Sequence, residues 1–261
     1  MPKFYEFFAG GGMARLGLGE EWTPLAANDF NPKKQAAYIA NWGGDEFIPG
    51  CISTLTPADL PGKADLAWAS FPCQDLSLAG KRRGIYADRS GAFWPFWQLM
   101  LELNEAGRIP PLIALENVTG MLTANRGKDF ADICEAMIDA GFKVGAAVID
   151  AQAFVPQSRK RVFVIAIRND LQLPDSIVRE TPDSKWHPDS MIRAVSQIRK
   201  GWIWLTLPTP PPRSISLAEL IEPKPSDVAW HDPDQTRQLL EMMSDRNRQK
   251  IDAAIQSKSK T

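Results

Sequence analysis

A cysteine that can act as a nucleophile follows a predicted buried strand. Cys73 lies in the segment Ser70-Phe71-Pro72-Cys73-Gln74, directly after the apolar run at residues 64–69. Open α/β sheets bind ligands at the carboxyl ends of their strands, and a proline restricts its own backbone and that of the preceding residue. The thiol is therefore expected on a defined turn at a ligand-binding edge. A lone cysteine is more often a small buried hydrophobic residue, so this assignment depends on the motifs that follow.

A carboxylate and two arginines lie at the ends of two further predicted strands. Glu116, followed by Asn117, ends the apolar run at residues 110–115, where a carboxyl can serve as a proton donor. Arg159 and Arg161 open the apolar run at residues 162–167. Residues two apart on an extended segment share one face, so both guanidinium groups can meet one phosphate or carbonyl oxygen. A basic tripeptide is otherwise typical of a solvated loop.

A glycine-rich turn joins the first predicted strand, at residues 4–8, to a helix-like segment at residues 13–18. Glycines there let the backbone approach a ligand closely, although the pattern is not G-x-G-x-x-G and does not indicate a dinucleotide. Asp29 ends the next predicted strand, where ribose-binding acids lie in nucleotide-binding sheets. Asp29 is alternatively a helix N-cap, since Asn31-Pro32 follows it, and both interpretations can hold.

Together these motifs resemble those of the DNA (cytosine-5)-methyltransferases of phages and bacteria. The resemblance covers residues 3–168 and rests on four segments in this order: Phe8-Ala9-Gly10-Gly11-Gly12, Phe71-Pro72-Cys73-Gln74, Glu116-Asn117-Val118 and Gln157-Ser158-Arg159-Lys160-Arg161. Each segment lies at the end of a predicted strand. One such motif can arise by chance, whereas four in order indicate the family.

The resemblance implies a methyl transfer to cytosine C5 through a covalent intermediate. Cys73 would add to C6 and make C5 nucleophilic, and Glu116 would protonate the ring at N3. Arg161 would hold the 2-keto oxygen, Arg159 would support the pocket, and Asn117 would hold the loop that carries the thiol. Since the target atom is inaccessible in a duplex, the base would have to be flipped out.

The resemblance also implies S-adenosylmethionine as the methyl donor. Asp29 would bind the ribose hydroxyls and Phe30 would stack on the adenine. The full set of implied cofactor-binding residues is Phe8, Ala9, Gly10, Gly11, Gly12, Asp29, Phe30, Cys51, Ile52 and Pro72. Cys51 departs from the family, which has an aspartate there to accept a hydrogen bond from the adenine amino group. A thiol is a poor acceptor, so we expect the cofactor to bind less tightly.

A basic segment between two glycines follows the predicted nucleophile. In the family this segment is a mobile loop that closes on DNA, with Gly80 and Gly84 as plausible hinges here. The implied DNA-binding residues are Gln74, Ser77, Lys81, Arg82 and Arg83. An ordinary surface loop is the alternative.

The order of predicted elements indicates an α/β fold. Strand-like and helix-like runs alternate up to about residue 170, which predicts a doubly wound, mostly parallel, Rossmann-like sheet. We predict a catalytic domain at residues 1–170. Residues 171–261, rich in proline and tryptophan, are predicted to be the irregular start of a target-recognition region. Residues 236–255 within them are predicted to form one polar helix.

Composition favours a globular enzyme over several other classes. Hydrophobic residues make up 44% of the chain, with no run of about 20 apolar residues and no signal-peptide pattern. We therefore expect a protein of the bacterial or phage-infected cytoplasm with no membrane partner. The three cysteines and two histidines lack the spacing of a zinc site, and Cys134 is expected in the core. A net charge of −1 argues weakly against a nucleic-acid binder.

The sequence leaves three functions open. The leading prediction is a DNA (cytosine-5)-methyltransferase, with a role such as restriction–modification. A non-catalytic DNA-binding or assembly subunit is the alternative, favoured by Cys51 and by the lack of the family's C-terminal motifs. A tRNA cytosine-5 methyltransferase is a weaker alternative, since it shares the chemistry. A fragment, a degenerate homologue, or half of a split enzyme completed by a second polypeptide would each explain the lack of those motifs.

Overall fold

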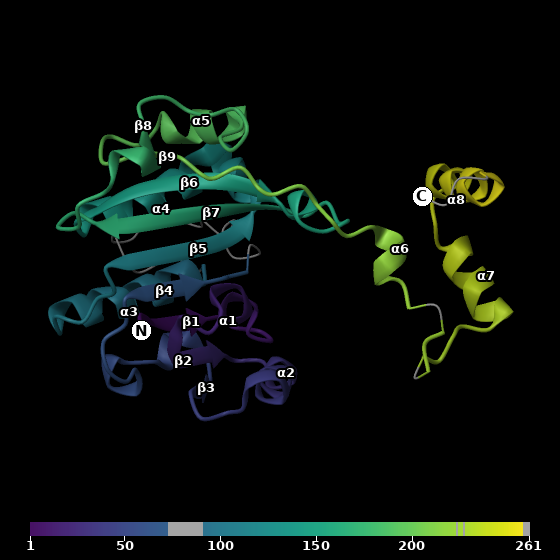
Figure 1. The fold of residues 1–261 in the computed structure, drawn as a ribbon, viewed down its shortest axis with the longest axis horizontal. Coiled ribbons are helices and arrows are strands. Elements are labelled where there is room, and N and C mark those ends of the chain that lie inside the picture. The colour runs from purple at the N-terminus through teal and green to yellow at the C-terminus, as the bar shows by residue number, and fades with distance from the viewer. Residues whose placement is uncertain (73–90, 223, 227, 258–261) are drawn as a thin grey trace. The chain divides into compact units, whose positions relative to one another are not determined.

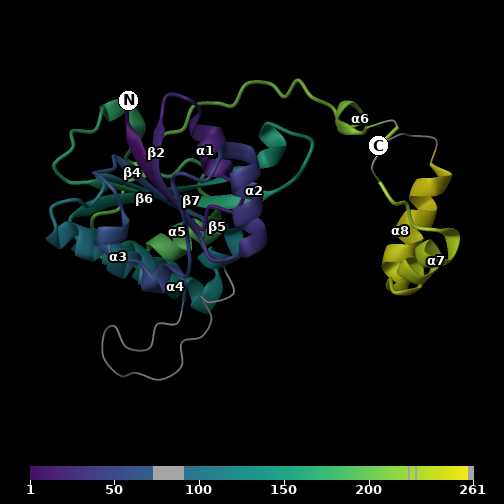
Figure 2. The same ribbon diagram turned by 90° about the horizontal axis from the view of Figure 1, so that it is seen from below.

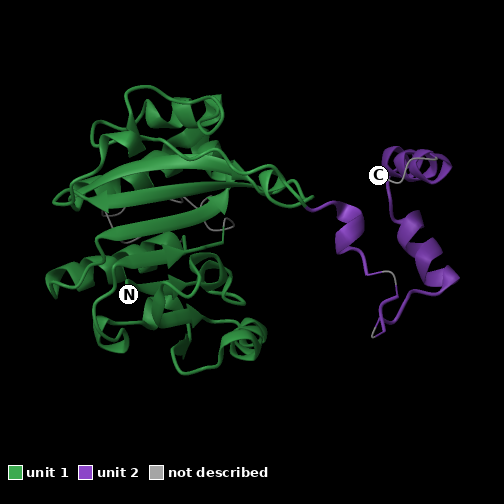
Figure 3. Ribbon diagram, in the orientation of Figure 1, with its two compact units in different colours: residues 1–214 green, residues 215–261 purple. Residues whose placement is uncertain are grey.

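The computed structural model describes residues 1–72, 91–222, 224–226 and 228–257 of the chain. These residues form two compact units, Met1–Ser214 and Ile215–Thr261 (Figure 3). This division falls well after residue 170, where the sequence predicts the end of the catalytic domain. Within the described residues, no helix is both long and apolar enough to cross a membrane.

The first unit is built on a seven-stranded sheet of order β3-β2-β1-β4-β5-β7-β6 (Figure 1). The strands are β1 (Lys3–Phe7), β2 (Thr23–Asp29), β3 (Phe47–Pro49), β4 (Leu66–Ala69), β5 (Leu112–Val118), β6 (Phe142–Asp150) and β7 (Lys160–Arg168). Neighbours are parallel except at β7, which runs antiparallel to β5 and to β6. The predicted mostly parallel, doubly wound α/β sheet is confirmed.

Helices cover both faces of this sheet (Figures 1 and 2). The helices are α1 (Met13–Leu18), α2 (Pro32–Trp42), α3 (Phe93–Glu105) and α4 (Lys128–Asp139). Short 3-10 turns lie at Ile52–Thr54, Pro57–Asp59, Thr119–Leu122, Ala124–Gly127, Ala151–Ala153 and Asp175–Ile177. Side chains of α3 and α4 pack on one face, and those of α1 and α2 contact the other.

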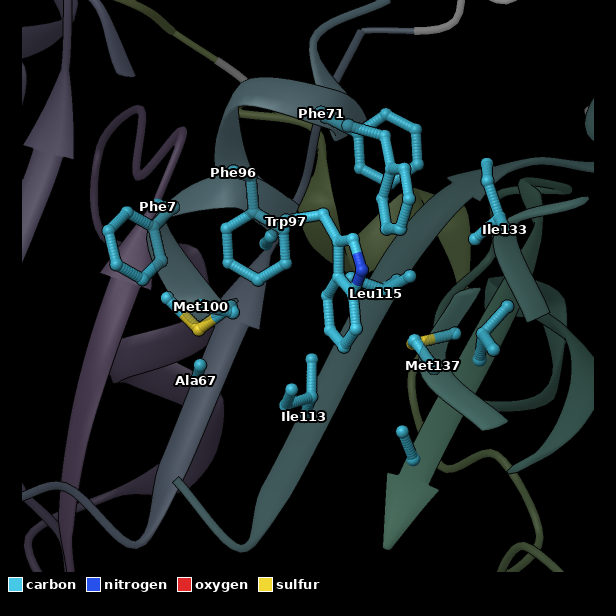
Figure 4. Packing of buried hydrophobic residues seen from close by; sticks show 14 of the residues in the cluster. Phe7, Ala67, Phe71, Phe96, Trp97, Met100, Ile113, Leu115, Ile133 and Met137 are labelled. Carbon is cyan, nitrogen blue, oxygen red and sulfur yellow. The ribbon is translucent and has the colours of Figure 1, made fainter. Parts of the chain in front are cut away.

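Side chains alternate between the two faces, as strand geometry requires. Phe7, Ala67 and Leu115 point to the face covered by α3, where Phe96 and Trp97 meet them (Figure 4). On the opposite face, Phe4, Leu66 and Ala114 form a smaller cluster with Leu18 and Trp22. Cys134 on α4 is fully buried, and burial raises the pKa of its thiol well above the usual value. The prediction that Cys134 belongs to the core is confirmed.

Residues 171–214 pack against β6. They contain β8 (Val178–Arg179), α5 (Asp189–Val195) and β9 (Trp204–Leu205). Val144 of β6 donates its N–H to the Gly201 carbonyl at 3.0 Å and accepts from the Ile203 N–H at 2.8 Å. Gly145 allows this approach, since a Cβ there would lie 2.7 Å from the Ile203 carbonyl oxygen. The segment is therefore part of the first unit.

The second unit is helical in its described residues. It contains α6 (Leu217–Leu220), α7 (Pro233–Glu241) and α8 (Asp245–Gln256). The prediction of one helix over residues 236–255 is wrong, because α7 ends at Glu241 and Ser244 is the N-cap of α8. Asp232 caps α7 and accepts from the Gln235 N–H at 2.8 Å. None of the three helices has a buried residue.

Candidate functional site

Asp29, Glu116 and Arg161, which the sequence singles out, lie at one edge of the sheet. Strand order reverses between β1 and β4, and ligands of open α/β sheets bind beside such a switch point at the carboxyl ends of the strands (Figure 1). Asp29 ends β2, and Glu116 lies near the end of β5. Because β7 is antiparallel to β5, its first residues lie at this same edge, with Arg161 opposite Val118.

The turn after β1 has a backbone conformation suited to a ligand site. Phe8, Gly10 and Gly12 all have positive φ, at 57°, 59° and 82°. A positive φ is uncommon for a phenylalanine, and such strained residues cluster at ligand sites. A Cβ added at Gly10 would meet no described atom within 4 Å, so open space lies against the turn. A Cβ at Gly12 would lie 2.2 Å from Trp42 Nε1, so this position requires glycine.

The end of α2 holds this turn from one side. The Asn41 side-chain amide and the Trp42 indole N–H both donate to the Gly11 carbonyl, at 3.1 and 3.0 Å. The Arg15 guanidinium lies 4.8 Å from the centre of the Trp42 ring. Sequence reasoning missed Asn41 and Trp42, because only the fold brings the end of α2 to the glycine turn.

The buried carboxylate of Glu6 binds the start of α1, directly after the glycine turn. Glu6 on β1 is 3% exposed and accepts a hydrogen bond from the Ala14 N–H at 3.1 Å. Burial raises the pKa of Glu6 to about 7, and the backbone N–H groups of Ala14 and Arg15 offset part of that rise. The sequence does not single out Glu6, so its role as a support was not predicted.

Asp29 ties the end of β2 to the glycine turn. Its carboxylate accepts from the backbone N–H groups of Gly10 and Asn31, at 3.1 and 3.0 Å. The side chain is 1% exposed, and the Lys34 ammonium lies 3.4 Å from Oδ2. The alternative that Asp29 is the helix N-cap is wrong, since Asn31 caps α2 by accepting from the Lys33 N–H.

Two further predicted cofactor-binding residues, Phe30 and Cys51, are exposed. Phe30, directly after β2, is 65% exposed although it is aromatic. Cys51 is exposed at the start of the Ile52–Thr54 turn, and Ile52 itself is buried. The Ser53 hydroxyl donates to the Cys51 sulfur at 3.1 Å, and this hydrogen bond lowers the pKa of the Cys51 thiol.

Glu116 is held from two neighbouring strands. Its Oε2 accepts from the Ser70 hydroxyl at 2.9 Å, and its Oε1 lies 3.5 Å from Arg161 Nε. The next residue, Asn117, is buried and donates its side-chain amide to the Phe71 carbonyl at 3.1 Å. The structure therefore joins three of the sequence motifs at the ends of β4, β5 and β7. It also adds Ser70, which sequence reasoning did not single out.

The turn before β7 is organised by one aspartate. Asp150 accepts from the backbone N–H groups of Gln152 and Arg159, at 3.0 and 2.8 Å, and from the Ser158 hydroxyl at 3.1 Å. The Gln152 and Arg159 hydrogen bonds lower the pKa of Asp150, despite an opposing effect of desolvation. Because β7 begins at Lys160, Arg159 lies in this turn, and Arg161 is the arginine that pairs with Glu116.

Part of the predicted site lies outside the described residues. The residues concerned are Cys73, Gln74, Ser77, Lys81, Arg82 and Arg83. Pro72, the last described residue before them, is exposed. The described residues contain no group of three or more metal-ligating side chains.

Comparison with known proteins assigns this arrangement to a family. The model of the C-5 cytosine-specific DNA methylases matches residues 2–251. The chain belongs to this family. Among curated methylase relatives, Type II methyltransferase M.BsuFI of Bacillus subtilis is 32% identical over 185 residues, 70% of this chain and 43% of the relative. M.NlaX of Neisseria lactamica is 30% identical over 188 residues, 69% of this chain and 58% of the relative. The chain spans about half the length of the curated relatives that it matches.

Solved structures agree with the methylase fold. The S. pombe Dnmt2 methyltransferase superposes with a TM-score of 0.55 at 25% identity, covering 67% of this chain and 53% of that protein. A putative DNA modification methyltransferase encoded within an E. coli prophage superposes with a TM-score of 0.53, covering 69% of this chain and 51% of that protein. At 18% identity, this second likeness concerns the fold alone.

Proposed function

We propose that this chain carries the catalytic part of a methyltransferase that transfers a methyl group from S-adenosylmethionine to cytosine C5 in DNA. One observation carries the proposal. Glu116 lies between Ser70 and Arg161, and Asn117 holds the Phe71 carbonyl two residues before Cys73. The Glu116 carboxylate, the Arg161 guanidinium and the backbone that leads to Cys73 lie at one edge of the sheet. The chain that carries them belongs to the methylase family.

The residues at the switch point fit S-adenosylmethionine. The open space against Gly10 leaves room beside the turn of Phe8, Ala9 and Gly10–Gly12, and the exposed Phe30 ring offers a face for an adenine. A carboxylate has about four lone-pair sites, so Asp29 can accept a ribose hydroxyl where the Lys34 ammonium now lies. We assign Cys51 and Ile52 to the adenine side and Pro72 to the methyl side. The cofactor would supply an electrophilic methyl group.

The proposed chemistry uses three side chains of this chain. The Cys73 thiolate adds to cytosine C6 and forms a C–S bond, while Glu116 gives a proton to N3. The electron pair of the C5–C6 double bond becomes available at C5, which forms a bond to the methyl group; the S–CH3 bond of the donor would break and S-adenosylhomocysteine would leave. Arg161 holds the 2-keto oxygen and stabilises the charge that develops there. Loss of the C5 proton to a base then breaks the C–S bond and returns the thiolate, and N3 gives its proton back to Glu116.

The remaining residues position the substrate. Asn117 fixes the backbone that leads to the thiol. Arg159 lies in the turn that Asp150 organises, two residues before Arg161. We assign Gln74, Ser77, Lys81, Arg82 and Arg83 to contacts with DNA that has a flipped-out cytosine. We further propose that residues 1–170 hold the catalytic elements and that residues 171–261 begin target recognition. A second polypeptide could supply further recognition elements.

The test is a trapping reaction on DNA that contains 5-fluorocytosine. Fluorine at C5 prevents loss of a proton there, so the enzyme should remain covalently bound to DNA in the presence of S-adenosylmethionine. The adduct is measured on denaturing gels and by mass spectrometry of the peptide that contains Cys73. Cys73→Ala should abolish the adduct, and Cys134→Ala is the matched control, because Cys134 is buried on α4.

Two results would contradict the proposal. Trapping that persists in Cys73→Ala would remove the assigned nucleophile. DNA binding without methyl transfer or adduct formation by the wild-type chain, tested with and without added recognition segments, would instead indicate a non-catalytic DNA-binding subunit.

A further inference from the structure

Ser70 lies on the same face of the sheet as the proposed acid. Trp68 and Ser70 are two apart at the end of β4, so they project to one face. Glu116 lies on β5, which lies between β4 and β7 (Figure 1). Its cross-strand partner on β7 is Phe163. The Trp68 and Phe163 rings meet edge to face at 6.1 Å. The Ser70 hydroxyl and this pair of rings therefore lie on the strands that flank Glu116.

The hydrogen bonds among these residues have a defined direction. The Trp68 indole N–H lies 3.0 Å from Ser70 Oγ, and Ser70 Oγ lies 2.9 Å from Glu116 Oε2. An indole N–H can only donate, so Ser70 Oγ must accept from it. The single proton of the hydroxyl then points to the carboxylate oxygen, which can accept it. Trp68 thus orients Ser70, and Ser70 donates to Glu116.

The two oxygens of Glu116 are held differently. Oε2 accepts a hydrogen bond of ordinary length from Ser70. Oε1 lies 3.5 Å from Arg161 Nε, which is longer than the usual N–H···O range of about 2.7–3.2 Å. The Arg161 guanidinium also donates to the Lys160 carbonyl at 2.9 Å, so it is partly engaged elsewhere. Oε1 is therefore the oxygen with acceptor or donor capacity left for a substrate.

We propose that Ser70, oriented by Trp68, is a positioning residue that fixes Glu116 Oε2 and leaves Oε1 to exchange the proton with cytosine N3. This inference rests on the proposed function. It assigns a direct role to neither Trp68 nor Ser70 in the chemistry, since both act through Glu116. Because a fixed carboxylate is already in the reactive geometry, losing Ser70 should lower the rate of the chemical step rather than substrate affinity.

Kinetics of four variants test this proposal. Methyl transfer to cytosine-containing DNA is measured for Ser70→Ala, Ser70→Thr, Trp68→Phe and the double variant Trp68→Phe/Ser70→Ala. Ser70→Ala should lower kcat roughly 10- to 100-fold, as expected for losing a hydrogen bond to a charged group, with KM for DNA and cofactor within about twofold of wild type. Ser70→Thr keeps the hydroxyl and should restore most of kcat.

The double variant distinguishes a relay from independent packing effects. Because the Trp68 N–H acts through Ser70, removing it after Ser70 has been lost should lower kcat no further. Independent, multiplicative losses in the double variant would overturn the proposal. So would a loss in Ser70→Ala that appears only in KM, or a Ser70→Thr variant as slow as Ser70→Ala.

A second measurement keeps the inference separate from the proposed activity. The Trp68 indole 1H–15N signal is assigned by its loss in Trp68→Phe and then followed in Ser70→Ala and Glu116→Gln. Both changes should move it, since they alter its acceptor or the group beyond that acceptor. The Trp22 indole, which packs against Phe4 on the same face, is the internal control.

The two failures are then distinguishable. A wild-type chain that transfers no methyl group, with or without added recognition segments, contradicts the proposed function, whatever the indole signal does. A Trp68 signal that moves in neither variant contradicts the relay, whatever the activity is.

Discussion

At the scale of single residues, Cys51 is the side chain whose chemistry fits its position least well. It lies two residues after β3, at a position where the family resemblance implies an aspartate, and its sulfur accepts a hydrogen bond from the Ser53 hydroxyl. The neighbouring Asp29 and Phe30 have the group types that a ribose and an adenine need. In the proposed cofactor site, Asp29 and Phe30 would serve the ribose and the adenine ring, whereas Cys51 would be a weak acceptor for the adenine amino group.

Cys51→Asp should tighten cofactor binding. A carboxylate would accept a charge-assisted hydrogen bond, which is worth about 1.5–3 kcal/mol and corresponds to roughly one to two decades in Kd. Calorimetry with S-adenosylhomocysteine measures the change. Cys51→Ser is the control, since a hydroxyl of similar size brings no charge and should leave Kd nearly unchanged. An unchanged or weaker affinity in Cys51→Asp would show that residue 51 does not face the adenine.

At the scale of elements, the junction of β1, the glycine turn and α1 depends on a buried carboxylate. Glu6 is buried next to the start of α1, and its pKa is about 7. A carboxyl whose folded-state pKa exceeds its unfolded value of 4.5 binds a proton more tightly in the folded state. Its contribution to stability is full below pH 4.5 and is lost as the pH rises through about 7.

Glu6→Gln should remove this pH dependence. In the wild type, Glu6 lowers the free energy of unfolding by roughly 3 kcal/mol between pH 4.5 and 7, since each pKa unit is worth about 1.4 kcal/mol. The glutamine side chain of the variant stays neutral and keeps an oxygen for the Ala14 N–H, so the variant should show a flatter profile over that window. Urea denaturation at several pH values measures it. A slope equal to that of the wild type would show that another group titrates there.

The sequence predicts the elements of this site better than the contacts between them. Strand ends carrying Asp29, Glu116 and Arg161 follow from apolar runs and their polar termini, and the fold brings them to one edge. The support of Gly11 by Trp42 does not follow, because it joins residues 31 apart whose proximity depends on how α2 packs. The hydrogen bond from Ser70 to Glu116 does not follow from the sequence either, since a serine before Phe71-Pro72 has no distinctive local pattern.

At the scale of the whole molecule, the boundary between the two units does not fall where the amino-acid composition changes. Proline becomes frequent soon after residue 170, yet the segment up to Ser214 is part of the first unit. Met191 and Ala194 of α5 are buried, as are Trp186 and Leu205. Frequent prolines indicate an irregular backbone, not an exposed one. Side chains of this segment are buried because residues 201–203 hydrogen-bond to the edge strand β6 and hold the segment against the sheet.

Two truncations should therefore behave in opposite ways. A chain that ends at Ser214 should keep the free energy of unfolding of the first unit within about 1 kcal/mol, because α6, α7 and α8 bury no residue. A chain that ends at Asp170 loses Trp186, Met191 and Leu205 from the core and exposes β6. Burying each such side chain stabilises by about 1.5–3 kcal/mol, so the combined loss is comparable to the roughly 5–15 kcal/mol of a typical domain. Thermal and urea denaturation of both chains, followed by circular dichroism, measure the difference. A cooperative transition of wild-type stability in the chain that ends at Asp170 would show that residues 171–214 are an accessory to the sheet, and would favour the domain boundary that the sequence alone predicts.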